Sequence, residues 1–394
     1  MRASIYYLSI CGIAVQLTLS LAVVDSICQI VQRHGAECQV HQVQTADGYQ
    51  LTMQRIPPPR NHSCPMLQPF VLMHGLIGSA GDFVAAGRAG ALAFQLHARC
   101  FDVWLPNARG TTQSRRHRTL AASEAAFWDF SWHEIGVYDL PAIVEHVLHV
   151  TGHRRLHYVG HSQGTTVLLV LLSQRPAYNA KFASVSLLAP VAYLQHLSSP
   201  PLRLLASDPG GVMLLLNQLG LHELLPATSL TQVGGQLLCS PALPTYALCI
   251  LITSLYVGFS EYPLDRNIFP RILETTPAGI SRGQLLHFGQ LINSGKFQQY
   301  DYRSTQLNLQ HYGQTSPPSY QLTNIRLNLM LFYGNRDALS SRMDVQRLVR
   351  ELSNCRIQLF QVRGYNHIDF LYAASAPQRI YERIIQQAIR INGV

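Results

Sequence analysis

The chain has 394 residues, of which 47% are apolar and 13% are charged, and its formal net charge is +9 at pH 7. This composition is typical of a folded protein with one large domain and an insertion, or with two domains, and it excludes intrinsic disorder. The positive charge is compatible with an anionic lipid surface or with ordinary solubility. No cluster of Lys and Arg with stacking aromatic residues indicates a nucleic-acid partner.

The N-terminus has the pattern of a secretory signal peptide. Met1-Arg2 is followed by an apolar stretch, and Ser20-Leu21-Ala22 resembles a cleavage site, so we expect the cut near Ala22. A signal anchor is the alternative, because the stretch approaches the ~20 residues that a membrane span requires. Asn61-His62-Ser63 is an N-glycosylation sequon in a Pro-rich loop, which agrees with passage through the secretory pathway.

Apolar or alternating runs between turn residues predict strands near 40–44, 51–55, 70–73, 102–105, 156–159, 184–189, 327–333 and 356–362. These runs predict the α/β class, with a mostly parallel sheet flanked by helices. Roughly 130 residues separate the sixth and seventh strands, far more than an ordinary connection needs. We therefore expect an inserted cap at 192–323 between core segments 23–191 and 324–394, after a signal peptide at 1–22.

Gly160-His161-Ser162-Gln163-Gly164 is a G-x-S-x-G sequence between a strand-like run and a helix-like run. This context is typical of a nucleophile elbow, in which small residues let the chain turn sharply and raise the serine Oγ above the sheet. The helix that follows points its N–H groups at any negative charge that develops nearby. Ser162 is the predicted nucleophile.

A serine nucleophile needs a base, and the base needs an acid that orients it. Asp337 follows the predicted strand 327–333, and His367 follows 356–362, so both fall at carboxyl ends of parallel strands, where sites form. The alternatives are that Asp337 only caps a turn, or that Asp344 or Asp369 is the acid. Asp344 falls inside an apparent helix and Asp369 too close to the histidine, so we favour Asp337.

An oxyanion hole is predicted where the strand 70–73 ends in His74-Gly75. The backbone N–H groups of Leu76 and of Gln163, the residue after the nucleophile, are the expected donors. Each donor of this kind contributes roughly 3–4 kcal/mol in the transition state. No zinc-protease, structural-zinc, dinucleotide or P-loop motif is present, so we expect no metal and no cofactor.

The chain resembles the α/β-hydrolase-associated lipase family, which includes the gastric, lysosomal acid and insect acid lipases. This resemblance implies an α/β-hydrolase fold with a helical cap. It also implies a catalytic triad of Ser162, Asp337 and His367 and an oxyanion hole of Leu76 and Gln163. Besides the elbow, it is carried by Asp47-Gly48-Tyr49, His74-Gly75-Leu76, Asn107-Ala108-Arg109-Gly110, Phe127–Gly136, Tyr138-Asp139-Leu140-Pro141, Thr276-Pro277-Ala278-Gly279, Gly289–Phe297, Tyr300-Asp301-Tyr302 and Tyr365-Asn366-His367.

The family's cap disulfide implies a bridge between Cys239 and Cys249, although one upstream family cysteine is missing here. Cys28 and Cys38 are another candidate pair. Loss of Cys11 with the leader leaves an odd number of cysteines, so at least one thiol is free or intermolecular.

The predicted cap is rich in leucine over 202–225 and nearly all apolar over 246–257. Such runs either pack on the core or line an acyl pocket and an exposed patch that contacts lipid. We therefore expect a secreted serine lipase that acts on long-chain triacylglycerol or steryl esters at a lipid–water interface, with contact to membranes or micelles but no obligate protein partner. A lysosomal location, a short-chain carboxylesterase, acyl transfer to an acceptor other than water, and a non-catalytic lipid carrier remain alternatives.

Overall fold

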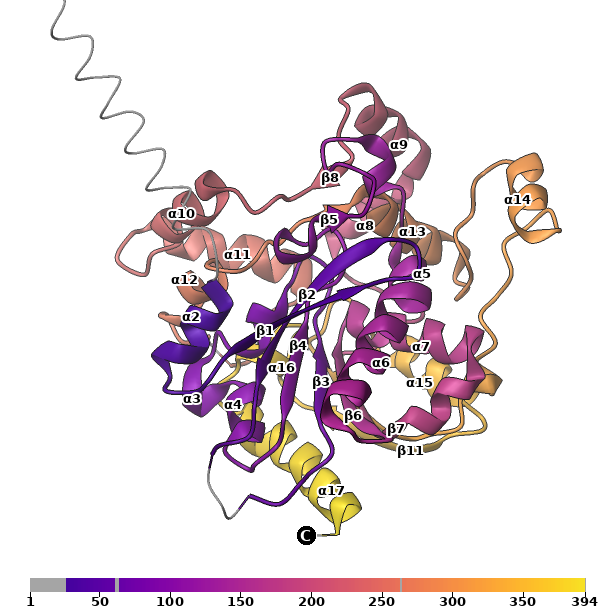
Figure 1. Cartoon of the computed structure of the whole chain (residues 1–394). Helices are drawn as coiled ribbons and strands as arrows, with labels where there is room; N and C mark the ends of the chain where they lie inside the picture. Colours follow the sequence, from indigo (N-terminus) through magenta and orange to yellow (C-terminus); the bar gives the residue numbers. More distant parts are fainter. Residues whose placement is uncertain (1–25, 61–63, 263, 394) are drawn as a thin grey trace, which may run out of the picture.

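The protein is described by a computed structural model over residues 26–60, 64–262 and 264–393 (Figure 1). The predicted signal peptide at 1–22 and the glycosylation sequon at Asn61 lie outside the described residues. No helix within the described ranges is long and apolar enough to cross a membrane.

A nine-stranded sheet forms the centre of the molecule, in the order β1-β2-β4-β3-β6-β7-β10-β11, with β5 paired to β2. All strands from β4 to β11 along this order pair in parallel, whereas β1–β2 and β2–β4 pair antiparallel. Each of the eight predicted strands is present. Their bounds are β1 Gln39–Gln44, β2 Tyr49–Ile56, β3 Phe70–Met73, β4 Val103–Pro106, β6 Leu156–His161, β7 Phe182–Leu188, β10 Asn328–Gly334 and β11 Arg356–Val362, and the short β5 is Arg116–His117.

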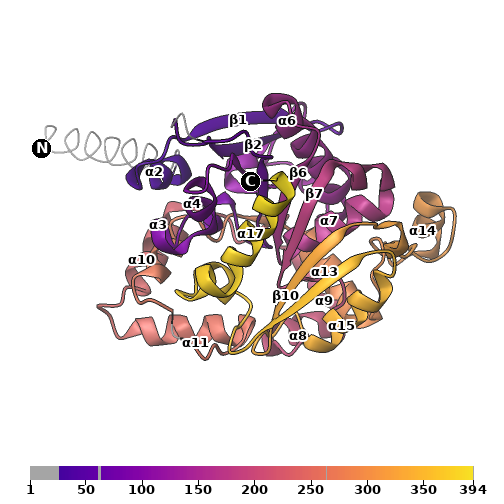
Figure 2. The same ribbon diagram turned by 90° about the horizontal axis from the view of Figure 1, so that it is seen from below.

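Helices cover both faces of the sheet, and the central strands β3 and β6 are therefore buried along their whole length. Two separate apolar clusters fill the space between the sheet and these helices. Figure 2 shows the two layers from below. One layer contains α2 Ser26–Arg33, α3 Gly87–Gly90, α4 Leu92–His97, α16 Asp369–Tyr372 and α17 Glu382–Asn392, and the other contains α5 Trp132–Glu134, α6 Leu140–Thr151, α7 Gln163–Gln174 and α15 Arg342–Glu351.

A long segment connects β7 to β10 and is largely helical. It lies above the sheet in Figure 1, and α14 projects from the body on an extended arm. Its elements are α8 Pro200–Ser207, α9 Pro209–Gln218, β8 Glu223–Leu224, α10 Ser229–Leu238, α11 Thr245–Val257, α12 Ile268–Ile272, β9 Ile280–Ser281, α13 Arg282–Ser294 and α14 Thr305–Tyr312. Because its connections reach the loops at the carboxyl ends of the strands, this segment covers the edge of the sheet where a site is expected.

Arg109 joins three of the sequence motifs inside the protein. Its side chain is 1% exposed and forms ion pairs with Asp139 at 2.7 Å and with Asp47 at 2.6 Å. The guanidinium carbon also lies 4.0 Å from the centre of the Tyr49 ring. A buried charge is tolerated only when it is paired and hydrogen-bonded. These motifs therefore hold the loop after β4 rather than contribute to chemistry.

Disulfides link Cys28 to Cys38, Cys64 to Cys100 and Cys239 to Cys249. The second pair was not anticipated from the sequence. Among the cysteines of the described residues, Cys355 has a free thiol and is half-buried.

Candidate active site

Ser162 lies on the turn between β6 and α7. Its backbone has a φ of +53°, a left-handed conformation that non-glycine residues rarely adopt. The Ser162 N–H donates to the Leu188 carbonyl at 3.0 Å, which fixes the turn against the neighbouring strand. The serine Oγ is therefore held above the carboxyl end of the sheet, as a nucleophile elbow requires.

The two glycines of the elbow are required by close backbone contacts. A Cβ on Gly164 would lie 2.3 Å from the Met73 carbonyl oxygen, and a Cβ on Gly160 would lie 2.7 Å from the Gly164 backbone. Tyr158 stabilises the same turn, since its hydroxyl donates to the Gly164 carbonyl at 2.7 Å. A larger residue at 164 would push α7 away from β3, and one at 160 would push α7 away from β6.

The structure brings Ser162, His367 and Asp337 together. His367 Nε2 lies 2.7 Å from Ser162 Oγ, and His367 Nδ1 lies 2.9 Å and 3.0 Å from the two carboxylate oxygens of Asp337. The backbone N–H groups of Leu339 and Ser340 also donate to Asp337. All three side chains are buried, so the imidazole can accept the serine proton while the carboxylate fixes its tautomer.

The two alternative acids lie in other contacts. Asp344 pairs with His196, 2.8 Å from its Nδ1, and its backbone N–H donates to the side chain of Ser341, which caps α15. Asp369 accepts the Asn366 N–H at 2.7 Å. Within the described structure neither carboxylate contacts His367.

The loop after β3 lies directly against the nucleophile. A Cβ on Gly75 would be 3.1 Å from Ser162 Cβ, so Leu76 follows at the position expected for an oxyanion donor. Among the hydrogen bonds of the described ranges, none uses the amide of Leu76 or Gln163 as donor. Both N–H groups therefore remain available beside the serine.

His74 shapes this loop. Its Nε2 accepts the Ala108 N–H at 3.0 Å, so Nδ1 carries the proton and donates to the Gly75 carbonyl at 2.8 Å. Burial lowers the pKa of His74 to about 4, which keeps the ring neutral at physiological pH. The neutral ring can then act as acceptor and donor at once.

Two further side chains make contacts beside the site: His161, which the sequence places next to the nucleophile, and Gln284, which the sequence analysis did not single out. His161 Nε2 donates to the His367 carbonyl at 2.8 Å, and burial, with the nearby His367, lowers the pKa of His161 to about 3. Gln284, on α13, donates to the Gln163 side chain at 3.1 Å. A capping box formed by Ser281 and Gln284 marks the start of α13, but it predicts a helix end and not this contact.

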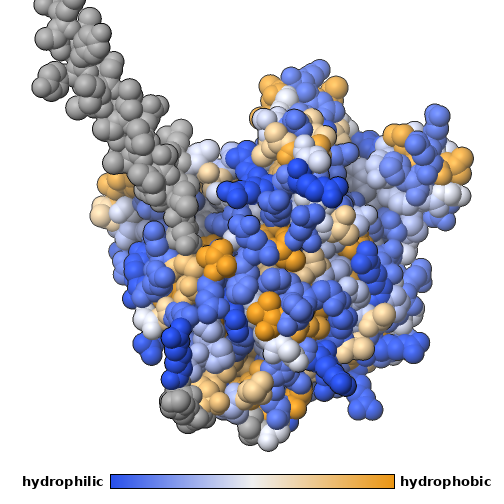
Figure 3. Space-filling model, viewed as in Figure 1, coloured by the Kyte–Doolittle hydropathy of each residue, from blue (hydrophilic) through white to orange (hydrophobic). Residues whose placement is uncertain are grey.

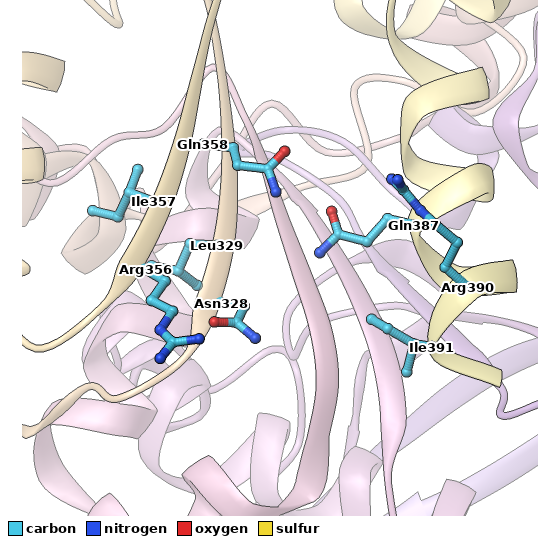
Figure 4. A pocket seen from close by; sticks show the side chains of 8 residues that line it. All are labelled: Asn328, Leu329, Arg356, Ile357, Gln358, Gln387, Arg390 and Ile391. Carbon is cyan, nitrogen blue, oxygen red and sulfur yellow. The ribbon is translucent and has the colours of Figure 1, made fainter. Parts of the chain in front are cut away.

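The hollow in Figure 4 does not belong to this site. Among the described residues, no group of three or more His, Cys, Asp or Glu is placed to hold a metal ion. The hollow lies between α17 and the starts of β10 and β11, at the opposite edge of the sheet from Asp337 and His367. Its lining is Asn328, Leu329, Arg356, Ile357, Gln358, Gln387, Arg390 and Ile391.

Comparison with known proteins defines the class of the chain. Residues 68–374 match the profile of the α/β hydrolase fold, and residues 27–87 match that of the partial α/β-hydrolase lipase region. A soluble variant of monoglyceride lipase from Saccharomyces cerevisiae shares the fold, with a TM-score of 0.56 and 13% identity over 91% of this chain and 96% of that one.

The chain belongs to the lipase family of α/β-hydrolases, which confirms the resemblance found in the sequence. It is 39% identical to Lipase 1 of Drosophila melanogaster over 92% of this chain and 79% of that protein. It is 36% identical to gastric triacylglycerol lipase of Rattus norvegicus, over 91% of this chain and 90% of the relative. Human lysosomal acid lipase/cholesteryl ester hydrolase is 33% identical over the same shares.

Two buried carboxyl groups flank the site without a basic partner in the described structure. Asp82, beyond the loop of Leu76, accepts hydrogen bonds from the hydroxyls of Thr276 and Tyr372 at 3.0 and 3.1 Å. Burial raises the pKa of Asp82 to about 6 and that of Asp369 to about 6. Both groups therefore bind a proton more tightly in the folded protein than in the unfolded chain.

We expect these two groups to make the fold more stable in acid. Between their ordinary pKa and about pH 6, the native state keeps protons on these two groups that the unfolded chain has lost, so their contribution to stability falls as pH rises through this window. For Asp82 alone the loss is about 3 kcal/mol. Because Asp82→Asn lacks this loss, its melting temperature relative to the wild type should rise between pH 4 and 7, whereas the difference between the exposed Asp265→Asn and the wild type should stay constant. An unchanged dependence in Asp82→Asn would contradict this account.

Proposed function

We propose that the protein is a serine lipase that hydrolyses carboxylic esters of long-chain fatty acids, with triacylglycerol or steryl ester as substrate. The observation that carries the proposal is the chain of contacts from Ser162 Oγ to His367 to Asp337. The names of the family relatives support an ester of this kind, because they include a triacylglycerol lipase and a cholesteryl ester hydrolase.

The mechanism follows from these positions. Ser162 attacks the ester carbonyl while His367 Nε2 takes its proton, and Asp337 stabilises the imidazolium that forms. The N–H groups of Leu76 and Gln163 bind the oxyanion, assisted by the positive end of the α7 dipole. His367 then returns the proton to the leaving alcohol. Water attacks the acyl-enzyme by the same route and releases the fatty acid.

We place the substrate-binding cap at 192–323, between core segments 23–191 and 324–394. Its helices expose many large apolar side chains, and Figure 3 shows hydrophobic residues on the projections formed by α9 and α14. On α10, Leu237 and Leu238 are 65% and 57% exposed. Apolar surface of this kind on a soluble enzyme favours adsorption to a lipid–water interface.

We propose an extracellular location, with the lysosome as the alternative. Three disulfides among the described residues are typical of the oxidising secretory pathway. The predicted signal peptide at 1–22 and a glycan on Asn61 belong to the same proposal. The buried carboxyl groups of Asp82 and Asp369 are compatible with an acidic medium in either location.

Ser162→Ala should reduce ester hydrolysis by roughly 10⁴- to 10⁶-fold, because the attacking atom is lost. Rates of the secreted protein on emulsified trioleoylglycerol, emulsified cholesteryl oleate and a short soluble ester measure this loss. Ser173→Ala, a buried serine further along α7, is the matched control and should remain active. Activity on the short ester alone would indicate a carboxylesterase. A wild type that binds fatty acid without hydrolysing any ester would indicate a carrier.

The double variant Leu237→Glu/Leu238→Glu should weaken adsorption to the emulsion, because two exposed apolar side chains become charged. We expect the apparent KM on emulsified trioleoylglycerol to rise about tenfold, the equivalent of about 1.4 kcal/mol, while kcat/KM on the soluble ester stays within twofold. The control, Met343→Glu/Leu359→Glu, places the same charges on exposed positions of α15 and β11. Equal effects of the two double variants would argue against an interface on α10.

A further inference from the structure

The carboxyl end of α11 lies between the loops that carry the acid and the base. The carbonyl oxygen of Val257, the last residue of α11, accepts the Ala338 N–H at 3.2 Å and the His367 N–H at 3.1 Å. Ala338 directly follows Asp337 in the chain. One backbone oxygen therefore bridges the two loops whose spacing sets the contact between Asp337 and His367.

Gly258 is what allows this approach. It has a φ of +101°, and a Cβ built on it would lie 1.9 Å from the Arg336 carbonyl oxygen and 3.0 Å from the Ala338 nitrogen. The Asn366 side chain donates to the Gly258 carbonyl at 2.9 Å, so the turn is also fixed from the side of the histidine loop. Both steric contact and backbone conformation exclude a side chain at this position.

His367 is held from the opposite direction as well. Its carbonyl accepts the His161 Nε2–H at 2.8 Å, while its N–H donates to Val257. The backbone polar groups on both sides of the imidazole are thus bound, one by the residue before the nucleophile and one by the inserted segment. Such contacts restrict the position of the ring relative to Ser162 and Asp337.

We propose that the carboxyl end of α11 is a positioning element of the active site, in which the Val257 carbonyl sets the spacing of Asp337 and His367 and Gly258 permits its approach. The inference rests on the proposed function, because it assigns how the acid and base of that reaction are aligned. On the same helix, Leu248, Leu251 and Ile252 are about half exposed to solvent. Helix α11 would therefore also belong to the apolar surface that we propose for adsorption to lipid.

The test compares Gly258→Ala with Gly152→Ala. Gly152, which caps the end of α6, also has a positive φ, +70°, but a Cβ there meets no atom within 4 Å. For Gly258→Ala on the soluble ester we expect kcat to fall at least tenfold with KM within twofold, because ångström-scale displacement of catalytic groups costs up to about 10²-fold. The acidic limb of the pH–rate profile should move to lower pH, because the imidazolium loses contact with Asp337. The far-downfield proton resonance of the His367 Nδ1–H should shift or disappear. Gly152→Ala should match the wild type in every readout.

A Gly258→Ala protein that folds and keeps the wild-type kcat, pH profile and resonance would overturn the inference. Amide hydrogen exchange of the wild type gives a second test that does not depend on a folded variant. The Ala338 and His367 amides should be protected and should lose protection together with residues 245–257 as urea is added. Exchange of these two amides at the rate of exposed loops would also overturn the inference.

Failure of the proposed function gives a different result. In that case the wild type does not hydrolyse esters, or Ser162→Ala remains active, whereas the resonance and the amide exchange still report on the positioning contact.

Discussion

The active site depends on the close packing of backbone at the turn from β6 to α7. Gly164 lies so near the Met73 carbonyl that the start of α7 and the end of β3 form one rigid unit. The end of β3 leads directly into His74 and Gly75, so the same contact places the loop of Leu76, the proposed oxyanion donor, beside Ser162. The left-handed backbone of Ser162 is tolerated because its neighbours fix the turn.

The buried carboxylates near the site differ in the donors around them. Asp337 accepts two backbone N–H groups and the imidazole of His367, and the pair of Asp139 and Asp47 shares the guanidinium of Arg109. Asp82 has hydroxyl donors but no cation, and burial therefore raises its pKa to about 6. Asp337 and Asp82 differ in their partners and not in their residue type.

Much of the fold could be predicted from the sequence, because buried parallel strands appear as continuous apolar runs. The runs at 70–73, 156–159 and 327–333 became β3, β6 and β10, and the residues after them became the loops of the site. Ser162 and Asp337 were predicted as triad members because each follows such a run, whereas His367 was predicted because it follows the alternating run 356–362. The two-residue strands β8 and β9 carry no comparable pattern.

Contacts that join distant segments left no local signal. The pairing of Cys64 with Cys100 depends on how the loop before β3 lies against the one before β4, which residue spacing does not determine. The hydrogen bond from Gln284 to Gln163 and the two accepted by Val257 arise from the packing of the inserted segment on the core. Sequence patterns predicted Ser162, Asp337 and His367, whereas the contacts that bring these side chains together depend on long-range packing.

The central claim is that Ser162 is an activated nucleophile, and covalent labelling tests it most directly. The wild type is treated with diethyl p-nitrophenyl phosphate, and intact-mass and peptide mass spectrometry are followed alongside residual esterase activity. The account predicts one diethylphosphoryl group per chain, on the peptide that contains Ser162, with loss of activity in proportion to labelling. Labelling of another residue, or full labelling of Ser162 with activity retained, would contradict it.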